Sequence, residues 1–232
     1  EACYVSGEHS QSLRERCAQA QDEMLLKKLL RQYRHLAMVT IAWRDIAGWA
    51  QLEETFLSLT ELAESCVQCA LEAATRWETQ RYGNPVDGND NVQQLLIIGM
   101  GKLGGIELNY SSDIDLIYFF PENGSTDGKK AVSNDEFFTA VGRRIIRLLD
   151  DLTEDGFVFR VDMRLRPFGK SGPLAMSFDA AEHYYQAQGR TWERYAMIKA
   201  RAIAGDLKAG EHFAEMVKPF VYRRYLDYGS LE

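Results

Sequence analysis

The stretch Gly99–Phe120, with the sequence GMGKLGGIELNYSSDIDLIYFF, constrains the fold of this chain more than any other. Two apolar runs, Leu95–Ile98 and Leu116–Phe120, flank a glycine-rich turn and a short polar segment, so we expect two strands with a compact connection. Because side chains alternate between the two faces of a strand, Asp113 and Asp115 would share one face. Two such carboxylates repel each other unless a cation lies between them, and their oxygens suit a hard divalent ion such as Mg²⁺.

A third carboxylate comes from residues Phe157–Arg166, FVFRVDMRLR, which alternate between apolar and charged types. This pattern predicts a half-buried strand. Its polar face would carry Arg160, Asp162, Arg164 and Arg166. Metal-assisted transfer of a nucleotidyl group needs about three carboxylates on rigid elements, and Asp162 would join the aspartate pair as metal ligand and catalytic residue. A structural ion pair of Asp162 with a neighbouring arginine is the alternative.

Other residues near these carboxylates are expected to bind nucleotide or phosphate. Glycines let the backbone approach phosphate oxygens, and arginines bind phosphate with two parallel hydrogen bonds. The candidates are Lys102, Gly104, Gly105, Ser112, Arg164 and Arg166. Solvent exposure is the alternative for Lys102, and capping of a neighbouring turn is the alternative for Ser112.

A dinucleotide-binding fold is a competing interpretation. Gly99, Gly101 and Gly104 form a GxGxxG motif after a predicted strand, and Glu122 lies near the position expected for a ribose-binding acid. However, a parallel crossover needs roughly 10–12 residues or more including its helix. The segment between Gly105 and Asp113 is shorter than that, so we reject this interpretation.

The rest of the chain predicts an α+β fold, a mixed sheet with flanking helices and with helical regions at both ends. Residues 12–82 have no proline and carry apolar residues at helical spacing, which predicts a helical subdomain over residues 1–85. Its basic face around Arg31 is expected to be solvated, with a contact to a partner or phosphate as the alternative. A loop-forming sequence at residues 82–91 marks the boundary of the next domain.

We expect the catalytic domain to span residues 86–178. Ser133 and Glu136 have the spacing of a capping box, which predicts a helix ending near Asp150. Residues 179–232 would form a C-terminal helical region that begins with one long helix to about Ala204.

Composition limits the partners of this chain. The formal net charge is −7, which disfavours nucleic-acid binding, and no apolar run approaches the roughly 20 residues that span a membrane. The cysteines are Cys3, Cys17, Cys66 and Cys69. Because no second Cys or His pair stands at zinc spacing, we expect reduced cysteines and a cytoplasmic location. The first residue is Glu1 rather than Met, so we expect a fragment of a longer polypeptide.

Three blocks of this sequence resemble the glutamine synthetase adenylyltransferase family. They are residues 95–120, residues 155–178 (DGFVFRVDMRLRPFGKSGPLAMSF) and residues 184–206 (YYQAQGRTWERYAMIKARAIAGD). Members of that family are bifunctional enzymes with two nucleotidyltransferase halves of the DNA polymerase β superfamily. The superfamily motif, two small residues followed by Asp-x-Asp and a later Asp, corresponds here to Gly104-Gly105, Asp113-x-Asp115 and Asp162.

The sequences of the second and third blocks are similar to those of the N-terminal half of the family's enzymes. The resemblance implies removal of AMP from adenylylated glutamine synthetase by phosphorolysis, with release of ADP and with two Mg²⁺ or Mn²⁺ ions as cofactors. It also implies regulation by the signal-transduction protein PII. The alternatives are the adenylylating half, which binds ATP and modifies glutamine synthetase, and a regulatory nucleotide-binding module without catalysis.

Overall fold

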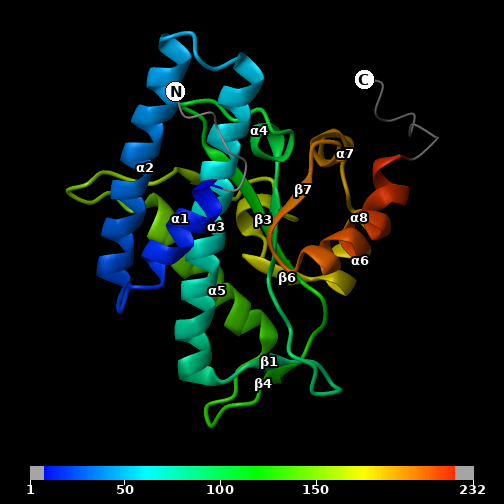
Figure 1. Cartoon of the computed structure of the whole chain (residues 1–232). Coiled ribbons are helices and arrows are strands. Elements are labelled where there is room, and N and C mark those ends of the chain that lie inside the picture. Colours follow the sequence, from blue (N-terminus) through cyan, green and yellow to red (C-terminus); the bar gives the residue numbers. More distant parts are fainter. Residues whose placement is uncertain (1–7, 223–232) are drawn as a thin grey trace.

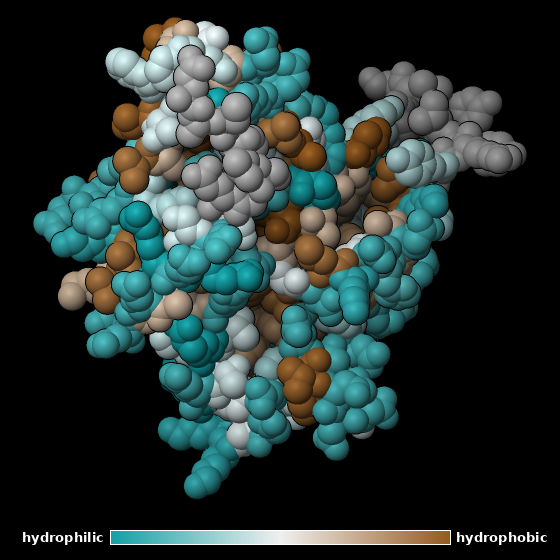
Figure 2. Space-filling view, viewed as in Figure 1, coloured by the Kyte–Doolittle hydropathy of each residue, from teal (hydrophilic) through white to brown (hydrophobic). Residues whose placement is uncertain are grey.

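The computed structural model describes residues 8–222 as helices packed on both faces of one mixed sheet (Figure 1). The predicted α+β class is therefore confirmed. Figure 2 shows hydrophilic side chains over most of the face that Figure 1 presents. No helix within residues 8–222 combines the length and the apolar character that crossing a membrane requires.

The sheet is built around β3, Ile114–Phe120, the strand that the aspartate pair opens. β3 pairs antiparallel with β2, Leu96–Gly99, on one edge, and on its other edge it pairs in parallel with β5, Val161–Asp162, and β6, Ala175–Ser177. The outer edge of β2 is covered by β7, Arg201–Gly205, in antiparallel pairing. A small separate ladder joins two short strands, β1 (Pro85–Val86) and β4 (Ser125–Thr126).

Alternating residues of the central strands belong to two different cores. Ile97, Leu116 and Tyr118 pack into one core, whereas Ile98 and Ile117 pack into the other. Strands buried on both faces carry mostly apolar side chains. In β3, the one charged residue is Asp115, near its start. The parity of the strand places Asp115 on the face of Ile117.

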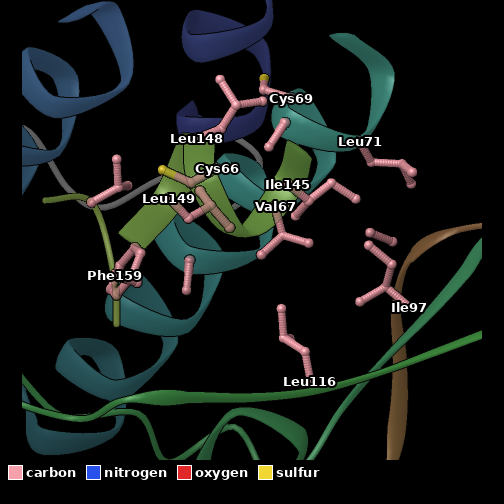
Figure 3. Close-up of a cluster of buried hydrophobic side chains, with 14 of the residues drawn as sticks. Cys66, Val67, Cys69, Leu71, Ile97, Leu116, Ile145, Leu148, Leu149 and Phe159 are labelled. Atoms are coloured by element: carbon pink, nitrogen blue, oxygen red, sulfur yellow. The ribbon is translucent and has the colours of Figure 1, made fainter. Parts of the chain in front are cut away.

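Four helices cover the first face of the sheet, and the last three cover the second (Figure 1). The first group comprises α1 (Glu8–Cys17), α2 (Glu23–Ile46), α3 (Leu52–Tyr82) and α5 (Asn134–Asp150). The second group comprises α6 (Phe178–Ala187), α7 (Thr191–Met197) and α8 (Leu207–Val221). Figure 3 shows how Val67 of α3 and Ile145 of α5 meet Leu116 of β3 in the first core.

Local signals explain where several of these helices begin. The predicted capping box of α5 is present, because Ser133 Oγ accepts the Glu136 N–H at 3.2 Å and the Glu136 carboxylate accepts the Ser133 N–H at 3.2 Å. Asp22 caps α2 by accepting the Leu25 N–H at 2.8 Å. The predicted helical subdomain is thus three helices, interrupted near residues 18–22 and 47–51.

Two predictions from periodicity are wrong. Of the strand expected over residues 157–166, only Val161–Asp162 pairs with a neighbour. The Asp162 carboxylate itself accepts the Arg164 N–H at 2.7 Å, which turns the chain out of the sheet. The helix expected over residues 179–204 is instead α6, α7 and β7. Gly189 lies at its break, where a Cβ would come within 2.4 Å of the Phe220 ring.

The basic face of α2 is also not uniformly solvated as predicted. The Arg31 side chain has no exposed surface and bonds to backbone carbonyls at the end of α5 and in the loop after it. The division into domains at residues 85 and 178 stays a prediction, although β7 brings a strand of the C-terminal region into the central sheet.

Two other expectations agree with the structure. β2 and β3 are antiparallel, which is incompatible with the parallel crossover of a dinucleotide-binding fold. Cys17, Cys66 and Cys69 are buried free thiols. Burial raises the pKa of Cys66, and a hydrogen bond with Cys17 together with burial raises the pKa of Cys69, which disfavours the thiolate form of these two residues. Cys3 lies outside the described residues.

Candidate functional site

The three predicted carboxylates come together at the start of β3. Asp115 stands directly opposite Asp162 in the parallel ladder of β3 and β5. Asp113 precedes β3 by one residue and shares the face of Asp115, while Ile114 between them is fully buried. Two extended segments that are far apart in the sequence thus present one acidic cluster, which we define as Asp113, Asp115 and Asp162.

The charges of this cluster act on each other. Burial raises the pKa of Asp115, and the neighbouring charges of Asp162 and Asp113 raise it further. Asp162 shifts the other way, because hydrogen bonds from Arg164 lower its pKa. Asp115 is therefore a partly buried acid whose ionised form is disfavoured by two like charges. A bound cation would remove that cost.

Two arginines neutralise the outer members of the cluster. Arg160 Nε donates to Asp113 Oδ1 at 2.5 Å, and Arg164 Nε donates to Asp162 Oδ2 at 2.6 Å. Their side chains are 55% and 67% exposed, so neither guanidinium is held in place by burial. Exposed ion pairs of this kind contribute little to stability, about 0–1 kcal/mol. Arg160 also donates to the Ser111 carbonyl at 3.0 Å and lies over the Phe157 ring.

The donor set fits a divalent cation in its chemistry. All three groups are carboxylates, the ligands that Mg²⁺ and Mn²⁺ prefer, and the crowding at Asp115 favours added positive charge. With Asp113 and Asp162 directed to their arginines, however, no group of three or more His, Cys, Asp or Glu side chains within residues 8–222 is arranged around one point as a metal would require. A divalent ion at this point would require the two exposed arginines to move away from their carboxylates.

The glycine turn forms one short helix, α4 (Gly101–Gly104), between β2 and β3. Its start lies against the acidic cluster: Met100 N donates to the Asp115 carbonyl at 2.9 Å, and Asp115 Oδ2 lies 3.3 Å from the position of a Cβ on Gly101. Gly101 has a φ of 56°, which favours glycine. The first N–H groups of a helix lack partners within it, so this end of α4 offers donors beside the carboxylates.

The two predicted phosphate-binding glycines have a structural task in the turn, and their binding of phosphate stays a prediction. The N–H groups of Gly104 and Gly105 donate within the turn, to the carbonyls of Met100 and Gly101. A Cβ on Gly104 would lie 1.8 Å from the Lys199 carbonyl oxygen. Gly104 is therefore required by the approach of a neighbouring backbone. Lys102 is exposed on the same turn, and its contact with phosphate stays a prediction.

Ser112 and Arg166 both organise loops around the acidic cluster. Ser112 Oγ donates to Asn109 Oδ1 at 2.7 Å, in agreement with the capping alternative. The Arg166 guanidinium donates to the carbonyls of Met163, Lys170 and Gly172 and so folds the loop that follows Asp162. Binding of phosphate by these two residues remains a prediction, whereas Arg164 is exposed and lies at the cluster.

Sequence reasoning missed a fourth carboxylate, Asp150, at the end of α5. Its pKa is raised by burial and by the charges of Asp151 and Asp113, and it accepts a hydrogen bond from the Val161 backbone. Asp150 thereby connects α5 to β5. The only available signal was its place at the end of a predicted amphipathic helix, which says nothing about what lies across from it.

A family model and several curated proteins match this chain. Residues 5–216 match the family model described as glutamate-ammonia ligase adenylyltransferase. The chain is 51% identical to a protein of Nitrosococcus oceani, over 99% of this chain and 24% of that protein. It is 54% identical to one of Thioalkalivibrio sulfidiphilus, over 91% and 22%, and 49% identical to one of Pseudomonas aeruginosa, over 99% and 24%.

All three relatives are named bifunctional glutamine synthetase adenylyltransferase/adenylyl-removing enzyme. The chain spans about a quarter of the length of these curated relatives (24%).

Proposed function

The chain belongs to the glutamate-ammonia ligase adenylyltransferase family, and from this premise we propose that its acidic cluster removes AMP from adenylylated glutamine synthetase by metal-dependent phosphorolysis. The observation that carries the proposal is the juxtaposition of Asp115 and Asp162 across parallel strands, with Asp113 on the same face and the start of α4 against Asp115. Carboxylates crowded beside free backbone donors suit a substrate that brings both a cation and a phosphate.

In the proposed reaction, an oxygen of orthophosphate attacks the phosphorus of the tyrosyl-AMP group in line with the tyrosyl oxygen. A new phosphorus–oxygen bond forms ADP and the bond to the tyrosyl oxygen breaks. The tyrosyl oxygen takes up the proton that the attacking phosphate gives up, and the tyrosine is restored. Divalent ions, when bound, would stabilise the charge on the attacking and leaving oxygens.

In the proposed reaction, the carboxylates would bind the ions, and the arginines and backbone N–H groups would bind the phosphate. Asp113, Asp115 and Asp162 would hold the ions from two adjacent strands, so that their separation is set by the sheet. Arg160 and Arg164, now paired with carboxylates, would turn their exposed guanidinium groups to phosphate oxygens. The first N–H groups of α4, with Lys102 beside them, would orient the phosphate next to Asp115.

The test uses the purified protein with AMP-modified glutamine synthetase, Mg²⁺ and orthophosphate. We expect ADP and unmodified glutamine synthetase in equal amounts, and no ADP when phosphate or Mg²⁺ is omitted. A folded protein that forms no ADP under these conditions would contradict the proposal. Release of AMP in place of ADP would indicate hydrolysis and would change the nucleophile.

Addition of AMP from ATP is a second candidate, because the names of the relatives include both activities. The same carboxylates would serve either reaction, since both are in-line transfers of an AMP group at phosphorus, with ADP released in one and pyrophosphate in the other. Incubation of unmodified glutamine synthetase with ATP labelled in the adenosine separates the two. Transfer of label without any phosphorolysis would favour this second candidate. Regulation by PII stays a family expectation.

A further inference from the structure

Arg201, at the start of β7, reaches the far end of the glycine turn. Its Nε donates to the Gly104 carbonyl at 3.1 Å, and its Nη2 donates to the Leu103 carbonyl at 3.0 Å. These carbonyls belong to the last two residues of α4. The last carbonyls of a helix lack partners inside it, and the Leu103 carbonyl also accepts the Ile106 N–H at 3.3 Å. A cation at this end also interacts favourably with the helix dipole. Arg201 therefore caps α4 from behind.

A helix of four residues needs such support. Isolated helices shorter than about 12 residues are marginal in water, so the position of α4 depends on what surrounds it. The backbone just before Arg201 presses on the same turn, because the Lys199 carbonyl occupies the space of a Gly104 side chain. The turn is thus fixed by β7 through both backbone packing and a guanidinium cap.

Glu64 of α3 fixes the guanidinium in turn. Its carboxylate pairs with Arg201 Nη2, and the two side chains are only 26% and 32% exposed. The pair is therefore more enclosed than the arginine pairs of the acidic cluster. It connects the helical subdomain to α4, although Arg201 and Glu64 lie 137 positions apart in the chain.

The opposite end of α4 lies against the acidic cluster, because Met100 N, at the N-cap, donates to the Asp115 carbonyl and Asp115 Oδ2 lies 3.3 Å from where a Cβ on Gly101 would be. A displacement of the turn would therefore displace its N–H donors relative to Asp115. We infer that Arg201 and Glu64 are positioning residues that hold the glycine turn in register with the acidic cluster. This inference rests on the proposed function for its catalytic consequence and on the hydrogen bonds alone for its structural one.

The first test compares Arg201→Met with the intact protein in steady-state kinetics. We expect the KM for orthophosphate to rise about tenfold and kcat to change much less, because misplaced donors weaken binding of the phosphate. Arg201→Lys keeps the charge but not the forked donors, so it should recover part of the loss. The matched control is Arg44→Met, which breaks a similarly enclosed arginine pair with Glu54 that joins α2 to α3.

The second test needs no substrate. In Arg201→Met, the amide hydrogens of Gly104 and Gly105, which are bonded within the turn, should exchange several-fold faster than in the wild type, while those of β3 stay unchanged. In the exchanged pair Glu64→Arg with Arg201→Glu, the ion pair can re-form but the glutamate cannot donate to the carbonyls. We therefore expect the fast exchange and the high KM to persist.

Recovery of slow exchange and of the wild-type KM by this exchanged pair would overturn the inference, because it would show that the ion pair alone matters. Unchanged exchange and KM in Arg201→Met would overturn it as well. If the wild-type protein has no phosphorolytic activity, the proposed function fails, but the exchange rates of the turn still decide the positioning role.

Discussion

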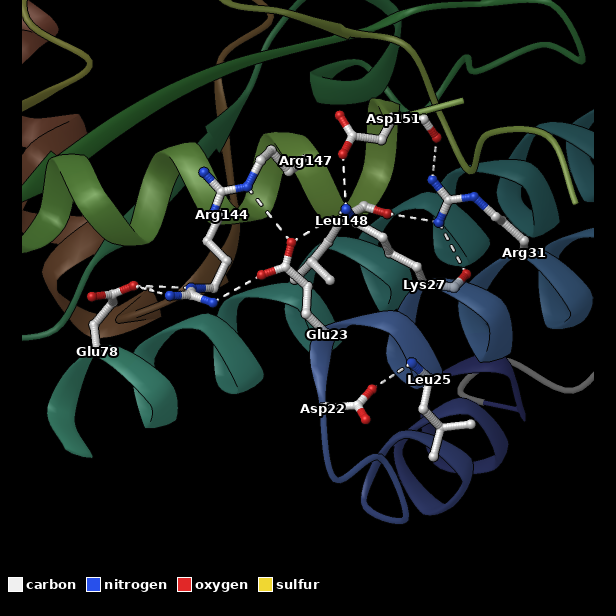
Figure 4. A network of polar contacts seen from close by, with 10 residues as sticks. All are labelled: Asp22, Glu23, Leu25, Lys27, Arg31, Glu78, Arg144, Arg147, Leu148 and Asp151. Carbon is white, nitrogen blue, oxygen red and sulfur yellow. Dashed lines mark hydrogen bonds and ion pairs between the residues drawn. The ribbon is translucent and has the colours of Figure 1, made fainter. Parts of the chain in front are cut away.

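Two of the regions in which arginines lie beside carboxylates differ in burial. Between α2, α3 and α5 lies a partly buried network of Glu23, Lys27, Arg31, Glu78, Arg144 and Asp151 (Figure 4). There Arg31 is 0% exposed and the Glu78 side chain is 3% exposed. In the acidic cluster, by contrast, the Arg164 side chain is 67% exposed.

The difference also concerns what the arginines bind. Arg31 donates to the carbonyls of Lys27, Leu148, Asp151 and Gly156. Its guanidinium thus supplies donors to backbone carbonyls at the end of α5 and in the following loop. The arginines of the acidic cluster instead offset carboxylates that crowd one another. Buried and fully bonded arginines maintain the fold, whereas exposed arginines beside crowded acids leave room for a ligand.

The largest expected effect is on the reaction. Asp162→Asn removes one charge of the acidic cluster but keeps an oxygen that can accept the Arg164 N–H. We expect kcat of phosphorolysis to fall on the order of a thousandfold, about 4 kcal/mol in transition-state stabilisation, with the unfolding midpoint nearly unchanged. Asp179→Asn, at an acid whose side chain is 73% exposed, is the matched control. Full activity in Asp162→Asn would remove this residue from the mechanism.

The next effect concerns the partly buried network. Arg31→Met leaves the carbonyls of Leu148 and Asp151 without the guanidinium donor, so we expect the free energy of unfolding to fall by about 3 kcal/mol. Urea denaturation followed by circular dichroism measures this change. Lys28→Met, at an exposed position of the same helix, should be nearly neutral. A comparably small effect of Arg31→Met would show that burial does not separate the two regions.

A third effect should appear only in the acidic cluster. If the carboxylates bind Mg²⁺, the folded state gains about 2.7 kcal/mol when the ion is present at 100 times its dissociation constant. We expect Mg²⁺ to raise the unfolding temperature of the wild type and of Lys28→Met, and not that of Asp162→Asn. An equal rise in all three would mean that Mg²⁺ binds elsewhere.

The sequence pattern correctly predicted the elements that depend on local residue spacing and on local hydrogen bonds. The helices of residues 12–82, the capping box at Ser133 and the strand after Asp115 follow from apolar spacing and local hydrogen bonds. The missed elements depend on partners far away in the chain. The segment from Arg201 to Gly205 is a strand because it pairs with the otherwise unpaired edge of β2. The sequence of the segment itself does not show that such an edge is available.

The sequence predicted the carboxylates of the acidic cluster but not the residues that support the glycine turn beside it. Strand alternation predicted the shared face of Asp113 and Asp115, and the parallel pairing of β5 brings Asp162 to them. The tasks of Gly104 and Arg201 were not predictable, because they arise from contacts between the turn and β7. Arg31 misled sequence reasoning for the same reason, since a buried guanidinium has the same local pattern as a solvated one.

The smallest expected effect is a gain in the free energy of unfolding on substitution of Asp115, opposite in sign to the loss expected for Arg31→Met. The folded-state pKa of Asp115 is raised above its ordinary value of 3.8, so its ionisation weakens the folded state. Asp115→Asn should therefore increase the free energy of unfolding at neutral pH without Mg²⁺, by on the order of 1 kcal/mol. The gain should shrink as the pH falls toward 3.8, where the wild-type carboxylate regains its proton. Urea denaturation at neutral and acidic pH, with Asp179→Asn as control, measures both changes. A loss of stability at neutral pH would show that Asp115, like Arg31, serves the fold rather than a ligand.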